Sequence, residues 1–335
     1  MRISFVVPDS MSAVRGGMKR IAEYASRLAK RGHEVYILSP DKEIPEWLSP
    51  YKGTYRLVNI DGYRTFRTDV AIATGGRSGR RLGRMTGAKV KCYSVVMKES
   101  LNKPTEKHGK IIDRDFVLRD PYGQKWIYYA NSTWMKNVVE QEFGQKCHLV
   151  LAPPNERMRP SESFKPQDKL WALGYGHGDW KGGQRTADAV ALAKKSLPNL
   201  EMIHYSQRGN PRSRCLVKHW SRPSQDLLPQ IYSSADVFIH SSRFEGFANT
   251  IGESMSCGVP CISYKTPGVE DLVIHNETGI IVDEFDVNHM ARAIIRLLTD
   301  NALYTKLKVK CVEHMQQFSW DSTLSKLEIL FKECL

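Results

Sequence analysis

The sequence has 335 residues, enough for two α/β domains of ordinary size or for one large domain. With 41% hydrophobic and 25% charged residues, its composition is typical of a soluble globular protein. A membrane-spanning helix is excluded, because no apolar run approaches the roughly 20 residues that one needs.

The formal net charge of +13 belongs to one half of the chain. Residues 1–160 hold 29 Lys and Arg against 16 Asp and Glu, a difference of +13, whereas residues 161–335 hold 20 of each. Such a concentration is either a solvated basic face or a surface for an anionic membrane, an acidic glycan or nucleic acid. It is densest in a stretch without acidic residues, at Arg77, Arg80, Arg81, Arg84, Lys89, Lys91 and Lys98.

The seven cysteines are scattered, and no two have C-x-x-C spacing. This favours a reducing compartment over a disulfide framework. The apolar pattern of a strand begins directly after Met1, so we expect no signal peptide. We therefore predict a cytoplasmic protein. Its basic half would allow it to bind peripherally to the inner face of the membrane.

The first half alternates strand and helix patterns. A near-continuous apolar run at 3–7 predicts a buried strand, and apolar residues on one face of 18–31 predict a helix that ends at Gly32. Ser132 is a suitable N-cap for a helix at 132–143. Further strands are predicted at 34–38, 56–60, 70–73, 90–96 and 126–130.

The stretch 157–169 is rich in Pro, Ser and charge and is predicted to link two domains. The alternation that follows predicts mostly parallel sheets, whose ligands bind beyond the carboxyl ends of the strands. We expect domains at 1–160 and 161–319, and a terminal helix within 320–335. Strands are predicted at 170–173, 200–204, 237–240, 261–264 and 279–282, and helices at 184–197, 225–233, 251–257, near Val269, 287–299, 301–318 and 321–334.

Two glutamates eight positions apart, Glu245 and Glu253, follow the predicted strand at 237–240. The pattern indicates a strand, a tight turn and a helix. Such a turn presents backbone N–H groups at the helix N-terminus, which together with the helix dipole are suited to hold phosphate. A carboxylate two turns into the helix can reach a sugar hydroxyl, and a carboxylate before the helix can reach a second one.

Residues 235–260, ADVFIHSSRFEGFANTIGESMSCGVP, resemble the donor-sugar motif of retaining glycosyltransferases of family 4. The resemblance continues through 268–273 and 276–279 and includes Gly16-Gly17 and Trp180-Lys181-Gly182. It implies a GT-B fold, in which two Rossmann-like domains with parallel sheets face a central cleft. The basic domain would bind the acceptor, the second domain would bind the nucleotide-sugar donor, and the helix at 320–335 would cross back to the first domain.

The resemblance also assigns roles. It places Glu253 at the ribose hydroxyls, Glu245 at the transferred sugar and Lys181 at the diphosphate, where a cation would stabilise the leaving group. Relatives carry an Arg shortly before this lysine, but here Tyr175 to His177 occupy those positions, and no His lies within 93–99 where relatives often have one. A second cation is therefore missing or supplied elsewhere. The backbone expected to approach the donor belongs to Gly16, Gly17, Gly246, Phe247, Ala248, Asn249 and Thr250.

Two other types of site are less well supported. Asp113-Arg114-Asp115 has the D-x-D pattern that binds Mn²⁺ or Mg²⁺ in GT-A enzymes, but a GT-B site uses cations and a helix dipole instead. We therefore predict no metal and no cofactor besides a nucleoside diphosphate sugar, with a UDP-sugar as first choice. Gly16-Gly17 lacks the G-x-G-x-x-G pattern of a dinucleotide site, which argues against a dehydrogenase.

The predicted function is metal-independent transfer of a hexose, with retention of configuration, to an acceptor hydroxyl. Our first choice of acceptor is an envelope glycan or lipid-linked intermediate at an anionic membrane. One alternative is a hydroxylated base in DNA, whose phosphates would also require a basic face. Another is a non-catalytic sugar-nucleotide-binding or scaffold protein. The surface expected to meet an anionic partner comprises Arg77, Arg80, Arg81, Arg84, Lys89 and Lys91.

Overall fold

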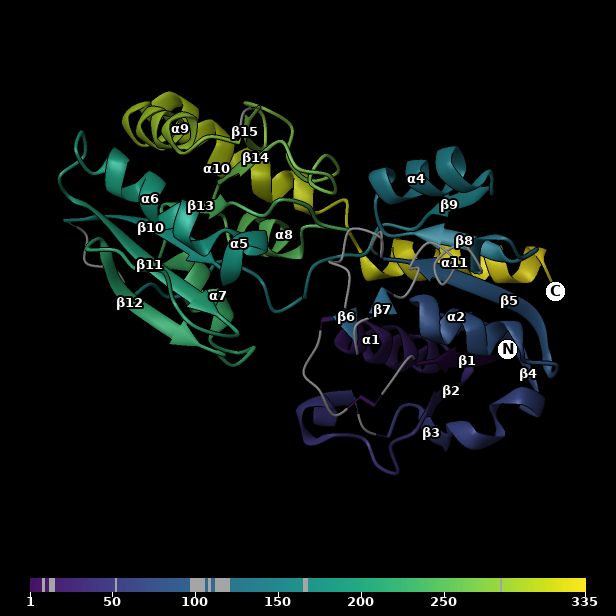
Figure 1. Ribbon diagram of the computed structural model, residues 1–335. Coiled ribbons are helices and arrows are strands. Elements are labelled where there is room, and N and C mark those ends of the chain that lie inside the picture. The colour runs from purple at the N-terminus through teal and green to yellow at the C-terminus, as the bar shows by residue number, and fades with distance from the viewer. Residues whose placement is uncertain are drawn as a thin grey trace. The chain divides into compact units, whose positions relative to one another are not determined.

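Figure 1 shows the computed structural model of the protein, which divides into two compact units. The first unit is Met1–Leu151 together with Trp320–Leu335, and the second is Ala152–Ser319. The boundary thus lies nine residues before the expected one at residue 160. The structure describes residues 1–7, 10–11, 16–51, 53–96, 106–107, 110–111, 121–164, 168–283 and 285–335.

The earlier boundary follows from contacts of the proline-rich segment that was expected to be a linker. The Arg157 guanidinium bonds to the carboxylate of Asp226, which lies just before helix α7 (Leu228–Ser233). The backbone N–H of Phe164 donates to the hydroxyl of Ser234 at 2.7 Å. These contacts attach the described part of the segment to the second unit.

The first unit contains a parallel seven-stranded sheet in the order β3-β2-β1-β4-β5-β8-β9. Helices α1 (Gly16–Lys30) and α11 (Trp320–Glu333) share a buried apolar cluster with one face, whereas α2 (Gly76–Gly83) and α4 (Thr133–Phe143) pack in the cluster of the other face. The strands are β1 (Arg2–Val6), β2 (Glu34–Ser39), β3 (Arg56–Asn59), β4 (Thr68–Ala73), β5 (Ala88–Val95), β8 (Ile127–Ala130) and β9 (Cys147–Leu149). The remaining elements of this unit are η1 (Glu46–Tyr51), η2 (Ile60–Thr65) and the antiparallel pair β6 (Glu106–Lys107) and β7 (Lys110–Ile111).

Helix α11 is held to the first unit by polar as well as apolar contacts. Arg31 binds both Asp321, at 2.7 Å, and Glu328, at 2.9 Å. The other carboxylate oxygen of Glu328 lies 2.8 Å from Nε2 of His33. Apolar packing is anchored by the fully buried Phe331. The final helix therefore belongs to the sheet formed by the amino-terminal half of the chain.

Replacing Glu328 by Gln is expected to destabilise the first unit by about 1 kcal/mol at pH 7. Burial raises the pKa of Glu328, but His33 and Arg31 outweigh it and lower the pKa. The stabilisation that Glu328 provides is therefore present above its pKa in the unfolded chain. It is lost as the pH falls through the lower pKa of Glu328 in the folded protein. Denaturant unfolding at pH 7 and pH 3 measures it. Glu333→Gln, an exposed change on the same helix, is the control, and an equal loss at both pH values would contradict the assignment.

The second unit contains a parallel six-stranded sheet in the order β12-β11-β10-β13-β14-β15. Its main apolar cluster contains residues of the strands and of α6 (Gly183–Ala193), α9 (Val287–Thr299) and α10 (Asn301–Met315). Residues 267–272 form turns rather than the short helix expected near Val269. The strands are β10 (Leu170–Tyr175), β11 (Leu200–Ser206), β12 (Leu216–Ser221), β13 (Val237–His240), β14 (Cys261–Tyr264) and β15 (Gly279–Val282), and the remaining helices are α5 (Gly178–Lys181) and α8 (Asn249–Ser256).

Candidate functional site

The candidate site lies where the strand order of the second sheet reverses. Strands β10 and β13 are neighbours, and the chain continues from them toward opposite edges of the sheet. Ligands of open parallel sheets bind outside the carboxyl ends of the strands at such a point. Lys181 lies in α5 directly after β10, and Glu245 lies in the turn after β13. Lys181 and Glu245, both predicted to bind the donor, therefore follow the two strands at which the order reverses.

Lys181 and Glu245 form a close ion pair. The distance from Lys181 Nζ to Glu245 Oε1 is 2.6 Å, and the exposed fractions of the two side chains are 30% and 9%. The turn before Lys181 requires glycine at Gly176, whose φ is +91° and where a Cβ would lie 2.4 Å from Cβ of Lys181. The ammonium is therefore directed to the carboxylate by a tight turn while part of it stays open to solvent.

Glu245 has a second partner in His240, the last residue of β13. Nε2 of the buried imidazole lies 3.4 Å from the same Oε1, and Nδ1 lies 3.0 Å from Ser263 Oγ on β14. Burial raises the pKa of Glu245, but Lys181 and the hydrogen bond with His240 outweigh it and lower the pKa to about 2. Glu245 is thus a carboxylate at neutral pH and can accept hydrogen bonds from hydroxyl groups.

Glu253 is held by a chain of tyrosines. The Tyr232 hydroxyl on α7 donates to Glu253 Oε2 at 2.9 Å and shares a hydrogen bond with the hydroxyl of Tyr205 on β11. Burial raises the pKa of Tyr232 well above its usual value, so its hydroxyl keeps its proton and remains a donor. Glu253 itself is half-buried in α8. Its carboxylate is therefore held by Tyr232 on one side and partly open to solvent.

The segment between the two glutamates forms a turn that leads into α8. Phe247 and Ala248 are buried, and Asn249 and Thr250 are the first residues of the helix. Gly268 supports this turn, since its φ is +84° and a Cβ there would lie 2.3 Å from the carbonyl oxygen of Glu245. The N–H of Ala248 donates to the Gly268 carbonyl at 3.1 Å. Gly246 to Ala248 thus form the turn, and Asn249 and Thr250 the first helical residues, between the two glutamates in the sequence.

The other predicted donor contacts lie in the first unit. Gly16 and Gly17 are the first residues of helix α1, which therefore begins two residues before the expected start at residue 18. Gly17 is exposed, and a Cβ built there would meet no atom within 4 Å. The structure therefore brings Lys181, Glu245, Glu253 and the turn together within the second unit, and it places both glycines in a separate unit.

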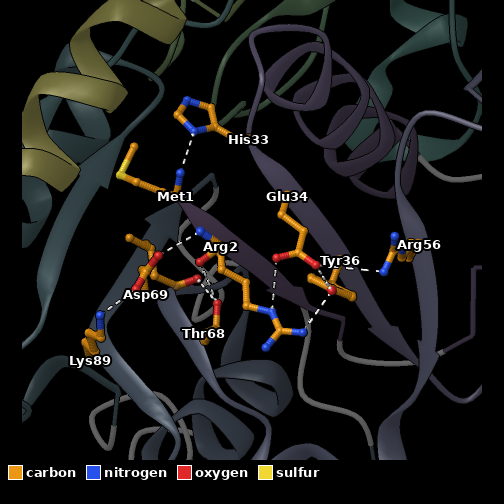
Figure 2. A network of polar contacts seen from close by, with 10 residues as sticks. Met1, Arg2, His33, Glu34, Tyr36, Arg56, Thr68, Asp69 and Lys89 are labelled. Carbon is orange, nitrogen blue, oxygen red and sulfur yellow. Dashed lines mark hydrogen bonds and ion pairs between the residues drawn. The ribbon is translucent and has the colours of Figure 1, made fainter.

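The predicted basic surface is partly engaged within the first unit. Lys89 pairs with Asp69 at 2.8 Å, and the other oxygen of Asp69 accepts the Arg2 N–H (Figure 2). Arg81 donates to the Val7 carbonyl at 2.8 Å, and Lys91 donates to a backbone carbonyl at 3.2 Å. The side chains of Arg77 and Arg84 are exposed on or next to α2, and that of Arg80 is half-buried.

Sequence reasoning missed His240 and Tyr232 as parts of the site. The available signal for His240 was its position at the carboxyl end of a predicted buried strand, where parallel sheets bind ligands. Two arginines, Arg185 and Arg243, are both bound to Asp179, two residues before Lys181. Arg185 also donates to the Ser241 carbonyl at 3.0 Å, so both guanidinium groups are engaged by protein oxygens.

The described residues offer neither a metal cluster nor a membrane-spanning helix. In the part of the chain that the structure describes, no group of three or more His, Cys, Asp or Glu side chains is placed to hold a metal ion. No helix there is both long and apolar enough to cross a bilayer. Asp113-Arg114-Asp115 and Lys98 lie outside the described residues.

Solved structures match the chain over nearly its whole length. Sucrose-phosphate synthase from Thermosynechococcus elongatus has a TM-score of 0.79 at 16% identity and covers 99% of both chains. The Anabaena protein HepE, in complex with UDP-glucose, has a TM-score of 0.72 at 13% identity and covers 99% of this chain and 100% of its own. The protein has the GT-B fold of glycosyltransferases, which confirms the predicted fold class.

A model of one protein family matches part of the second unit. Residues 216–316, from β12 to α10, match the family Glycosyl transferases group 1, and this segment contains both glutamates. The D-inositol 3-phosphate glycosyltransferase of Corynebacterium diphtheriae is 32% identical over 110 residues, which are 33% of this chain and 26% of that protein. The chain spans about a quarter of the length of the first curated relatives that it matches. It therefore carries a glycosyl transferases group 1 domain.

Proposed function

We propose that the protein is a retaining glycosyltransferase that moves a hexose from a nucleoside diphosphate sugar to an acceptor hydroxyl. The observation that carries this proposal is the arrangement of Lys181, Glu245 and Glu253 at the reversal point of a sheet within a group 1 domain. The UDP-glucose bound to HepE supports a UDP-sugar as the donor.

Each side chain has a role that its chemistry supports. Glu253 accepts hydrogen bonds from the paired ribose hydroxyls, and Glu245 accepts them from the transferred sugar. Lys181 leaves Glu245 to bind the diphosphate, where it offsets the charge that develops on the leaving group. The N-terminus of α8 adds a positive dipole end. These groups support transfer without a metal ion.

Retention of configuration follows if bond formation and bond breaking occur on one face of the sugar. The bond from the anomeric carbon to the phosphate oxygen breaks, and a bond to the acceptor oxygen forms on the same side. The acceptor proton passes to the departing phosphate oxygen. Such a step requires positioning and charge stabilisation rather than an enzymic nucleophile, which fits a site made of two carboxylates and a lysine.

A donor screen by thermal unfolding tests this function. At a concentration of 100 times its dissociation constant, a UDP-sugar is expected to stabilise the protein by about 2.7 kcal/mol, because it binds only the folded state. GDP-, ADP- and TDP-sugars are compared in the same assay, and sugar transfer is then measured with the donor that binds. Binding without transfer would favour the non-catalytic alternative, and no shift with any donor would contradict the donor site.

For the acceptor, we propose an envelope glycan or lipid-linked intermediate at an anionic membrane, bound through the first unit. The net charge of +13 and the exposed Arg77 and Arg84 support this choice. Basic side chains near an anionic bilayer each contribute about 1 kcal/mol of attraction. The protein would then act as a peripheral membrane enzyme.

Replacing Arg77 and Arg84 together by Ala is expected to weaken binding to anionic vesicles by about 30-fold, which corresponds to two basic contacts. The control removes the same charge from Lys326 and Lys332, which are exposed on α11. An equal loss in both variants would contradict binding through α2. Binding of duplex DNA that falls steeply with salt, without vesicle binding, would favour the DNA acceptor.

A further inference from the structure

We propose that His240 is a positioning residue that holds Glu245 in place when Lys181 leaves it for the donor diphosphate. The inference rests on the proposed function, because a diphosphate is what draws the lysine away. Lys181 and His240 both contact Oε1 of Glu245, at 2.6 Å and 3.4 Å. A lysine bound to phosphate would leave the imidazole as the partner of that oxygen.

Glu245 needs such a partner because it is buried. Only 7% of the residue is exposed, and among the described residues no third side chain bonds to Oε1. A buried carboxylate that loses its hydrogen-bond donors bears its full desolvation cost, and it would turn away from its place or take up a proton. Either change would remove a fixed acceptor for the sugar hydroxyls.

The imidazole is itself fixed by the neighbouring strand. His240 and Ser263 are paired in the register of β13 and β14, and Nδ1 lies 3.0 Å from Ser263 Oγ. The fully buried Ser263 hydroxyl also lies 2.8 Å from the Tyr264 carbonyl oxygen. With the Nδ1 edge held by the sheet, Nε2 is directed at Glu245.

The direction of the Ser263 hydroxyl fixes the tautomer that serves Glu245. When the hydroxyl donates to Nδ1, the neutral ring carries its one N–H at Nε2, and that N–H donates to Glu245. This tautomer gives Glu245 a donor that does not depend on Lys181.

Three variants and two ligands test the proposal. His240→Leu removes the donor, His240→Gln keeps an N–H donor on the side chain, and Ser263→Ala removes the anchor of the ring. Sugar transfer is measured with a UDP-sugar, and affinity is measured for UDP, which has no sugar to meet Glu245. His240→Leu is expected to lower transfer by about 10- to 100-fold, the worth of a hydrogen bond to a charged group. UDP affinity is expected to stay within about twofold.

The Gln variant should recover most of the lost rate, and Ser263→Ala should fall between the wild type and His240→Leu. Equal losses for transfer and UDP affinity, unchanged transfer in His240→Leu, or no recovery in the Gln variant would overturn the proposal. The imidazole ¹⁵N resonances of His240 give a readout without donor, and they should shift in Glu245→Gln. Failure of every nucleotide to bind the wild type would refute the proposed function alone, whereas unshifted resonances would refute the contact with His240.

Discussion

Lys181→Ala is expected to lower the rate of sugar transfer at saturating donor by about 10²- to 10³-fold, the usual effect of removing one preorganised group that stabilises a leaving charge. The loss should appear in kcat, because the charge on the diphosphate grows as its bond to the sugar breaks. This ammonium is bound to Glu245 at 2.6 Å, so it is held beside the carboxylate assigned to the sugar.

The matched control is Lys195→Ala, an exposed lysine that follows α6 in the same unit. It removes the same charge without touching the site and should leave transfer within about twofold. Lys181→Ala also deprives the buried Glu245 of its closer partner, so the unfolding free energy of the variant is measured first. A folded Lys181→Ala protein that transfers sugar at the rate of the control would contradict the role of this lysine.

Glu253→Gln is expected to weaken donor affinity by about 10- to 100-fold while changing kcat less. A hydrogen bond to a charged group is worth about 1.5–3 kcal/mol, and the amide replaces one of the two carboxylate oxygens that the ribose hydroxyls would meet. Gln keeps a carbonyl oxygen that can accept from Tyr232, so the buried tyrosine pair should stay satisfied. The loss therefore reports on the donor rather than on folding.

Titration calorimetry with UDP and with the UDP-sugar measures this effect. Both ligands should lose affinity equally, because both carry the ribose. Glu277→Gln, an exposed carboxylate in the same unit, is the control. Unchanged affinity in Glu253→Gln would assign the ribose to another residue, and a loss limited to the UDP-sugar would place Glu253 at the sugar end.

The resting ion pair has a consequence for donor binding. If Lys181 turns from Glu245 to the diphosphate, as we propose, donor binding exchanges one charge-assisted contact for another. The net gain in binding free energy is smaller than the gain from the new phosphate contact alone, because the ion pair between Lys181 and Glu245 must first be broken. In our proposal the position of Glu245 after that exchange depends on His240. The His240 variants are therefore measured both with UDP and with a UDP-sugar.

The alternation of strand and helix patterns predicted the fold well, because buried parallel strands are nearly continuous apolar runs. The GT-B class is confirmed, and Ser132 caps α4 as expected, since its hydroxyl accepts the N–H of Met135 at 3.2 Å. Strands β9 and β12 were missed. The first has three residues, and the second is an edge strand in which polar residues interrupt the apolar ones, so neither has a strong periodic pattern.

The site could be predicted only in part. A motif placed both glutamates at a strand-to-helix turn, but the contact between Lys181 and Glu245 joins residues 64 positions apart and depends on the pairing of β10 with β13. His240 looks like an ordinary core residue until the register of β13 and β14 brings it to Ser263. Long-range geometry of this kind requires the assembled sheet.

The most direct test of the donor site is a crystal structure with a non-transferable UDP-sugar analogue. We expect the diphosphate within hydrogen-bond distance of Lys181 Nζ, the ribose hydroxyls on the carboxylate of Glu253, and the sugar beside Glu245. A nucleotide bound elsewhere on the second unit, with Lys181 still paired to Glu245, would contradict this assignment.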